Sequence, residues 1–113
     1  MSRDLRAFLH DILLHIEHAQ MALEKAERPL MYPAPETMIM IYCLQIIGES
    51  VKHIPDEVRD MHPEIPWKKV AGMRDVLIHK YWGIDLEILE ETVSERLPEI
   101  EATVREILQK FEN

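Results

Sequence analysis

The second half of the sequence contains three side chains that could act together on a phosphate group: Arg74, His79 and Tyr81. The guanidinium of an arginine stays charged at all working pH values and offers a planar fork of N–H donors to a phosphate. The imidazole of a histidine titrates near neutrality and can therefore move a proton. A tyrosine adds a hydroxyl that can form a hydrogen bond or be modified. These residue types are those that phosphate chemistry on RNA can use.

The charge distribution favours a small anion site on an otherwise acidic chain. The whole sequence has 13 basic and 21 acidic residues, a formal net charge of −8. The window from Trp67 to Trp82, however, holds four basic residues and only one acidic residue, Asp75. A net negative charge argues against a broad groove that binds nucleic acid without regard to sequence. A local phosphate contact fits this pattern better.

The relative placement of the candidate residues depends on the helix expected to carry them. On a regular helix, Arg74 and Tyr81 share a face, and so do Asp75 and His79. We therefore interpret Asp75 as the partner that orients His79 and favours its charged form. Arg74 and His79 would lie about 140° apart on such a helix. Both can reach one phosphate only if the helix end is distorted or if the site is a cleft with walls from more than one element.

The elements that must position this window are predicted to be helices. Apolar residues at steps of three and four predict a first helix over about 3–27, with Ser2 as its N-cap. A second helix is expected from about 36 to 53, ended by Pro55. Its interior, residues 38–47, is apolar on nearly every side. Such a helix must be covered all round, so it is either central or also packs on another subunit.

The remaining elements complete an all-helical prediction. A third helix is expected over 66–80, with Gly83 at its C-terminal stop. The segment 85–111 again has helical periodicity, and Pro98 predicts a kink or a junction of two helices. No segment has the pattern of a strand. We therefore predict an all-α, up-down bundle of four to five helices that forms a single domain over residues 1–113.

Composition excludes several other classes of protein. The single cysteine, Cys43, cannot form an intrachain disulfide or a zinc site built on cysteines, and we expect it to be buried. The apolar run over 38–47 is about half the length needed to cross a bilayer. The first residues, MSRDLRAF, do not resemble a signal segment, so we expect a cytoplasmic protein.

Several short motifs occur in an order that is informative as a set. They are IGES at 47–50, IP at 54–55, PEIPW at 63–67, GMRDVLIHKYW at 72–82 and LP at 97–98. The set resembles the HEPN superfamily in its HepT-like branch, whose R-x4-H-x-Y motif matches Arg74, His79 and Tyr81. The resemblance covers nearly the whole chain. Asp75 departs from the asparagine often found in this branch and places a negative charge beside any bound phosphate.

This resemblance implies a metal-independent endoribonuclease that needs no cofactor and acts as a homodimer, with its site where two protomers meet. It implies that Arg74 and His79 are catalytic and that Asp75 and Tyr81 support them. Similar proteins are toxins that a separately encoded nucleotidyltransferase antitoxin of the MntA type neutralises. In related pairs that antitoxin adenylylates the motif tyrosine, here Tyr81. Cleavage would proceed by attack of the RNA 2′-OH and would leave a 2′,3′-cyclic phosphate.

Two other hypotheses remain open. The chain could be a non-catalytic, nucleotide-binding partner subunit of a minimal nucleotidyltransferase that uses the same Arg74 pocket, or a purely structural helical dimer. Glu49 and Lys52 are candidates for a cleft wall, although such charges usually lie on solvated helix faces. Cyclic-phosphate ends in an RNA digest without metal would favour the enzyme. Nucleotide binding without cleavage would favour the partner subunit.

Overall fold

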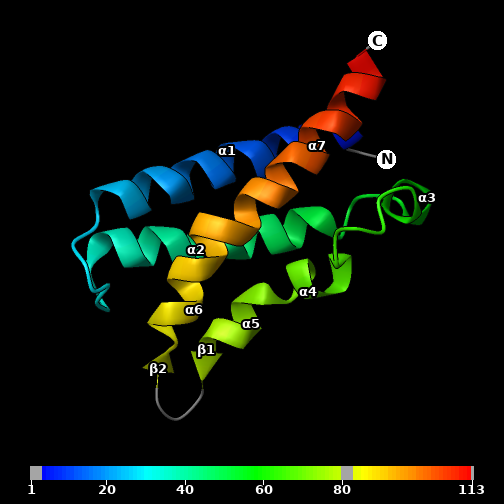
Figure 1. Cartoon of the computed structure of the whole chain (residues 1–113). Helices are drawn as coiled ribbons and strands as arrows, with labels where there is room; N and C mark the ends of the chain where they lie inside the picture. The colour runs from blue at the N-terminus through cyan, green and yellow to red at the C-terminus, as the bar shows by residue number, and fades with distance from the viewer. Residues whose placement is uncertain (1–3, 80–82, 113) are drawn as a thin grey trace.

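Two antiparallel helices and a long rod that crosses them form the framework of the protein (Figure 1). The computed structural model describes residues 4–79 and 83–112, and for residues 76, 78, 79 and 112 only the backbone. The two antiparallel helices are α1 (Leu5–Lys25) and α2 (Pro35–Val51). The rod consists of α6 (Leu86–Glu91), the π-helical turn η1 (Thr92–Arg96) and α7 (Leu97–Glu112). The expected all-helical class is confirmed in that the fold is mostly helical. The expected bundle of four to five helices is wrong in its count: within the described residues α1, α2 and α7 are long, and four further helices have only five or six residues each.

Helix α1 begins later than the sequence pattern suggested, because Asp4 is its N-cap. The Asp4 carboxylate accepts a hydrogen bond from the backbone N–H of Arg6 at 2.8 Å. This bond and those from the Arg6 side chain hold the pKa of Asp4 below its usual value. Ser2, the expected cap, lies outside the described residues. An aspartate that satisfies a free N–H of the first turn is a favoured N-cap.

Helix α2 is buried on one side only. Pro35 occupies its first turn, where a missing N–H costs nothing, and the helix ends at Val51 rather than at His53. The side away from the core exposes Met38, Ile39 and Tyr42, which are 50%, 47% and 58% exposed. The sequence left two alternatives for this helix: coverage on all sides within one protomer, or additional packing on another subunit. The exposed residues show that the first alternative is wrong.

The segment between α2 and the motif is held by a tryptophan and a glycine. The short helix α3 (Asp56–Asp60) is followed by α4 (Trp67–Ala71), and the indole Nε1 of Trp67 donates to the carbonyls of Arg59 and His62, each at 3.1 Å. A Cβ at Gly48 of α2 would lie 2.8 Å from the carbonyl oxygen of Ala71. Only glycine therefore allows the backbone of α4 to approach α2 this closely.

The predicted continuous helix over 66–80 is wrong. Helix α4 ends at Gly72, α5 (Met73–Leu77) is a separate helix, and the chain then enters strand β1 (Ile78–His79). This strand pairs in antiparallel fashion with β2 (Gly83–Ile84), with His79 opposite Gly83. In a continuing helix, the Leu77 carbonyl would accept from the N–H four residues later. Here it accepts from the backbone N–H of Asp85 at 2.8 Å.

This hairpin also corrects two details of the prediction. Two short strands exist where no strand was expected, although the fold remains mostly helical. Gly83 is not a helix stop: it lies in the hairpin with φ 93°, in the left-handed region that favours glycine. The side chain of Asp85 then caps α6 by accepting from Ile88 N at 3.1 Å.

The irregularity predicted at Pro98 is confirmed. Pro98 lies in the first turn of α7, directly after the π turn η1. A proline within a helical segment lacks an N–H and crowds the carbonyl four residues earlier. A locally widened turn before it relieves this crowding without ending the rod.

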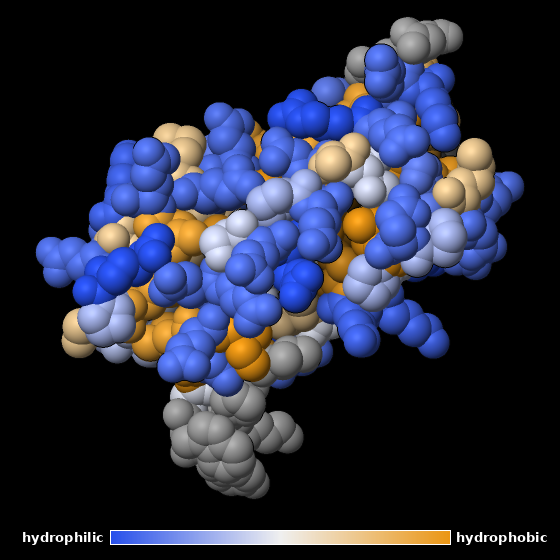
Figure 2. Space-filling view, in the orientation of Figure 1, coloured by the Kyte–Doolittle hydropathy of each residue, from blue (hydrophilic) through white to orange (hydrophobic). Residues whose placement is uncertain are grey.

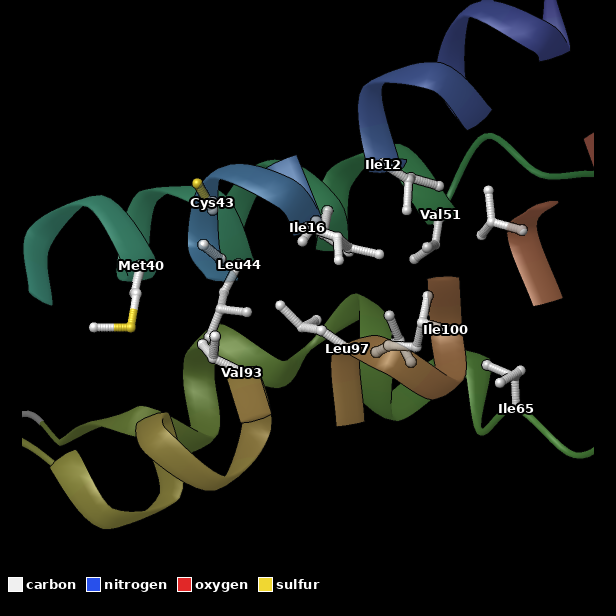
Figure 3. Packing of buried hydrophobic residues seen from close by; sticks show 14 of the residues in the cluster. Ile12, Ile16, Met40, Cys43, Leu44, Val51, Ile65, Val93, Leu97 and Ile100 are labelled. Carbon is white, nitrogen blue, oxygen red and sulfur yellow. The ribbon is translucent and has the colours of Figure 1, made fainter. Parts of the chain in front are cut away.

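The core lies where the rod crosses the α1–α2 pair. Ile16 of α1, Leu44 of α2, and Val93 and Leu97 of η1 and α7 point toward one another there (Figure 3). Cys43 is buried at the edge of this cluster, and burial raises the pKa of its thiol to about 11. The face of the molecule shown in Figure 2 is largely hydrophilic, with apolar residues between the charges. Among the described residues, no helix is both long and apolar enough to cross a membrane.

Candidate functional site

Arg74 has the properties expected of a phosphate-binding side chain. It is the second residue of α5, and its side chain is 43% exposed. Its Nε is buried and has no hydrogen-bond partner within the described part of the chain. Its Nη1 lies 3.7 Å from Oδ1 of Asp75, which is too long for a hydrogen bond. The guanidinium thus keeps donors that an anionic ligand could accept from.

Asp75 does not have the geometry that the sequence suggested. The expected pairing with His79 relied on both residues lying one turn apart on a helix. Because α5 ends at Leu77 and His79 lies in β1, that helical relationship is absent. The Asp75 carboxylate is instead 82% exposed beside Arg74. Its nearest described charge is therefore the arginine.

The break between α5 and β1 changes how Arg74 and His79 are related. On an unbroken helix, Arg74 and His79 would face different directions. For both to reach one ligand, the sequence therefore required either a distorted helix end or a cleft with walls from more than one element. The helix does end between them, at Leu77. The side chain of His79 and the whole of Tyr81 lie outside the described residues.

The backbone on both sides of the hairpin is fixed by the core. Leu77, the last residue of α5, is 1% exposed. Its carbonyl accepts the hydrogen bond from Asp85 N that closes the base of the hairpin, and Asp85 in turn caps α6. Helices α4 and α5 both pack on α2, where Gly48 permits the close approach. Arg74 is consequently presented by a segment with little freedom to shift.

Glu49 and Lys52, the expected cleft wall, pair with each other. Their side chains are 3.1 Å apart at the end of α2 and are mostly exposed. Their place in a cleft therefore stays a prediction.

A groove beside the motif was not foreseen from the sequence. It lies between α4–α5 and η1–α7, and its rim includes Lys69 and Arg96. The basic window and the Pro98 irregularity were both visible in the sequence. Neither signal revealed that the two segments face each other. Within residues 4–79 and 83–112, no group of three histidine, cysteine or acidic side chains is placed to hold a metal ion.

Comparison with known proteins gives a consistent set of matches. The family model described as Ribonuclease HepT-like matches residues 12–107. A protein named as an RNase in Caldanaerobacter subterraneus subsp. tengcongensis is 50% identical over 74 residues, 66% of each chain. One named as an RNase in Methanocaldococcus jannaschii is 37% identical over 111 residues, 97% of this chain and 96% of its own. A protein named ribonuclease HepT in Thermococcus cleftensis is 37% identical over 105 residues, 88% of this chain and 92% of its own. No solved structure matches.

Proposed function

Since the chain belongs to the HepT-like ribonuclease family, we propose that it is a metal-independent endoribonuclease in which Arg74 and His79 are catalytic. One observation carries this proposal: Arg74 has a half-exposed guanidinium that forms no hydrogen bond with any described residue, and the helix that bears it ends before His79. The family match spans the whole motif, including Tyr81. The same match supports a single functional domain over residues 1–113.

The proposed reaction uses the hydroxyl that distinguishes RNA from DNA. A base removes the proton of the 2′-OH, the oxygen attacks the neighbouring phosphorus, and an acid protonates the leaving 5′ oxygen. The products are a 2′,3′-cyclic phosphate and a free 5′-OH. Arg74 stabilises the negative charge that grows on the phosphate oxygens. One histidine per chain cannot serve as acid and base at once, so His79 of each of two protomers would take one role.

The exposed side of α2 supports a homodimer. Met38, Ile39 and Tyr42 form an apolar face there, and apolar surface of this kind is typical of contact sites between proteins. We propose that a second copy covers this side of α2, and the resemblance in the R-x4-H-x-Y motif implies that the two motifs then meet at one site.

The proposed biological setting is a toxin–antitoxin pair that acts in the cytoplasm. A cognate nucleotidyltransferase antitoxin of the MntA type would neutralise the ribonuclease. Adenylylation of Tyr81 would add bulk and negative charge beside the position of the RNA phosphate, and repulsion would block binding. Asp75 and Tyr81 would thus support the site. Tyr81 would also be the residue through which the antitoxin controls the ribonuclease.

The decisive test is incubation of the purified protein with transfer RNA and total RNA in the presence of a metal chelator. Wild-type protein should produce fragments that end in 2′,3′-cyclic phosphate. His79→Ala should abolish cleavage, and Arg74→Ala should slow it strongly, since loss of one positioned donor typically costs about 3–4 kcal/mol in the transition state. His18→Ala, which removes an exposed histidine of α1, is the matched control and should cleave normally.

An unchanged rate for His79→Ala would overturn the catalytic assignment. The second candidate function, a nucleotide-binding partner subunit without activity, is favoured by the formal net charge of −8 and by the Asp75 carboxylate beside Arg74. Nucleotide binding that depends on Arg74, together with no cleavage of any RNA, would select this candidate instead.

A further inference from the structure

A groove of about 480 Å³ lies between the segments that lead into and out of the β1–β2 hairpin. Val70 and Met73 line one wall, and Arg96 and Ile100 line the other. Met73 directly precedes Arg74 in the chain. The groove therefore lies beside the segment that carries Arg74, although Arg74 itself does not line it.

The floor of the groove is apolar and rigid. Ile65, Val70 and Ile100 are 4%, 5% and 3% exposed, so the rest of the core holds them in place. The face of a nucleic-acid base can pack on aliphatic side chains of this kind through van der Waals contacts, whatever the sequence.

The rim of the groove carries charges that match a nucleotide. Lys69 of α4 forms no ion pair among the described residues and is exposed. Arg96 is only loosely held, at 3.4 Å from Glu91 and 3.5 Å from Glu99. Exposed pairs of this kind contribute about 0–1 kcal/mol, so a phosphate can replace them. Glu64 and Glu99 add carboxylates that can accept from the amino groups of a base.

The π turn that precedes Pro98 also lies at this groove. Both ends of η1, Thr92 and Arg96, line it. A π turn has poorer packing than a regular helix and is often found at functional sites. Here it places the terminal residues of the turn on the wall that faces Val70 and Met73.

We propose that this groove binds one nucleotide of single-stranded RNA next to the scissile phosphate. The base lies on the apolar floor, and Lys69 and Arg96 bind the phosphate of that nucleotide. This inference rests on the proposed ribonuclease function and adds to it a substrate-binding site outside the R-x4-H-x-Y motif.

The test measures binding separately from cleavage. Short single-stranded 2′-O-methyl RNA cannot be cleaved, because it lacks the attacking hydroxyl. Lys69→Gln and Arg96→Gln should each weaken its binding about fivefold to tenfold and lower the slope of log Kd against log salt by about 0.7, the value of one lost phosphate contact to a single strand. Cleavable RNA should show a raised KM with kcat unchanged.

Two control variants remove the same charges elsewhere. Lys68→Gln acts one residue away on α4, outside the groove, and Arg105→Gln removes an exposed arginine of α7 that pairs with Glu101 at 2.9 Å. Both should bind RNA as the wild type does. Thermal unfolding of all four variants should match the wild type, because all four side chains are exposed.

The outcomes separate this proposal from the function on which it rests. If the groove variants bind RNA like the two controls, or if the wild type binds no RNA, the nucleotide site is overturned. If the groove variants lose RNA binding but the wild type cleaves no RNA, the groove assignment stands and the ribonuclease proposal falls. If they keep RNA binding and lose binding to a nucleotidyltransferase, the groove is a protein contact and the RNA assignment is overturned.

Discussion

Arg74 combines two environments in one side chain. Its Nε is buried without a described partner, whereas the rest of the guanidinium is half-exposed. The exposed part of the guanidinium can offer two parallel N–H donors to a phosphate, a two-point contact that arginine makes and lysine cannot.

Cys43 gives a prediction about pH at the same scale. Burial raises the pKa of its thiol from 9.0 to about 11 in the folded protein. Between these two pKa values the folded protein keeps the thiol proton, whereas the unfolded chain loses it. The contribution of Cys43 to the free energy of unfolding is therefore fully present below pH 9 and is lost as the pH rises toward 11. The unfolding free energy of the wild type should fall by about 2 kcal/mol more than that of Cys43→Ala over this range.

Urea unfolding of both proteins at a series of pH values measures this difference. Every other titratable group is present in both proteins, so the comparison isolates Cys43. Parallel curves for the two proteins would contradict the raised pKa.

At the scale of elements, the contact between α2 and α4 decides how the motif is presented. Gly48→Ala would place a methyl group 2.8 Å from the carbonyl oxygen of Ala71, a backbone atom that cannot rotate away. Overpacking typically costs about 1–3 kcal/mol, and the better helix propensity of alanine returns up to about 1 kcal/mol. We expect a net loss of about 1–2 kcal/mol in urea unfolding, together with weaker RNA cleavage because α4 and α5 must shift.

Gly72→Ala is the matched control for this prediction. A Cβ at Gly72 would meet the Lys68 carbonyl oxygen at 3.7 Å, an ordinary contact, and the φ of Gly72 is −105°. Its effect on stability should stay within about 0.5 kcal/mol. Equal stability of Gly48→Ala and Gly72→Ala would show that the close approach at Gly48 is unimportant.

The elements also show how far the sequence can be interpreted alone. Helix α1 and the rod could be predicted because their apolar residues recur at helical spacing, whereas α2 could be predicted from an apolar run that ends before Pro55. The hairpin could not, since each strand is two residues long and the bond that ends α5 joins Leu77 to Asp85, which is not a local pairing. Of the site, the sequence identified Arg74 but could not reveal its buried Nε. The groove depends on two segments that are distant in sequence, so no local pattern indicates it.

At the scale of the whole molecule, the exposed side of α2 predicts the assembly. Tyr42 is 58% exposed in the protomer, so Tyr42→Glu should leave the fold of one protomer intact. In a dimer that covers this side of α2, the same change would bury a charge against apolar surface, which is strongly unfavourable. We expect Tyr42→Glu to be a monomer in sedimentation velocity and to lose RNA cleavage, because each site would then have one histidine.

Phe111→Glu is a suitable control, because it introduces the same charge at an exposed aromatic residue of α7. It should remain dimeric and active. A wild-type protein that is monomeric at all concentrations, or a dimeric Tyr42→Glu, would contradict the proposed interface.

The π turn also sets the rotation of α7 about the rod axis relative to α6. An extra residue in a widened turn rotates everything after it by about 100° relative to an unbroken helix. Removing one residue from Thr92–Arg96 would therefore regularise the backbone while rotating buried residues of α7, such as Val104 and Ile107, away from the core. The chain tolerates a locally inferior helix there because the alternative would be a better helix with its apolar face turned to water.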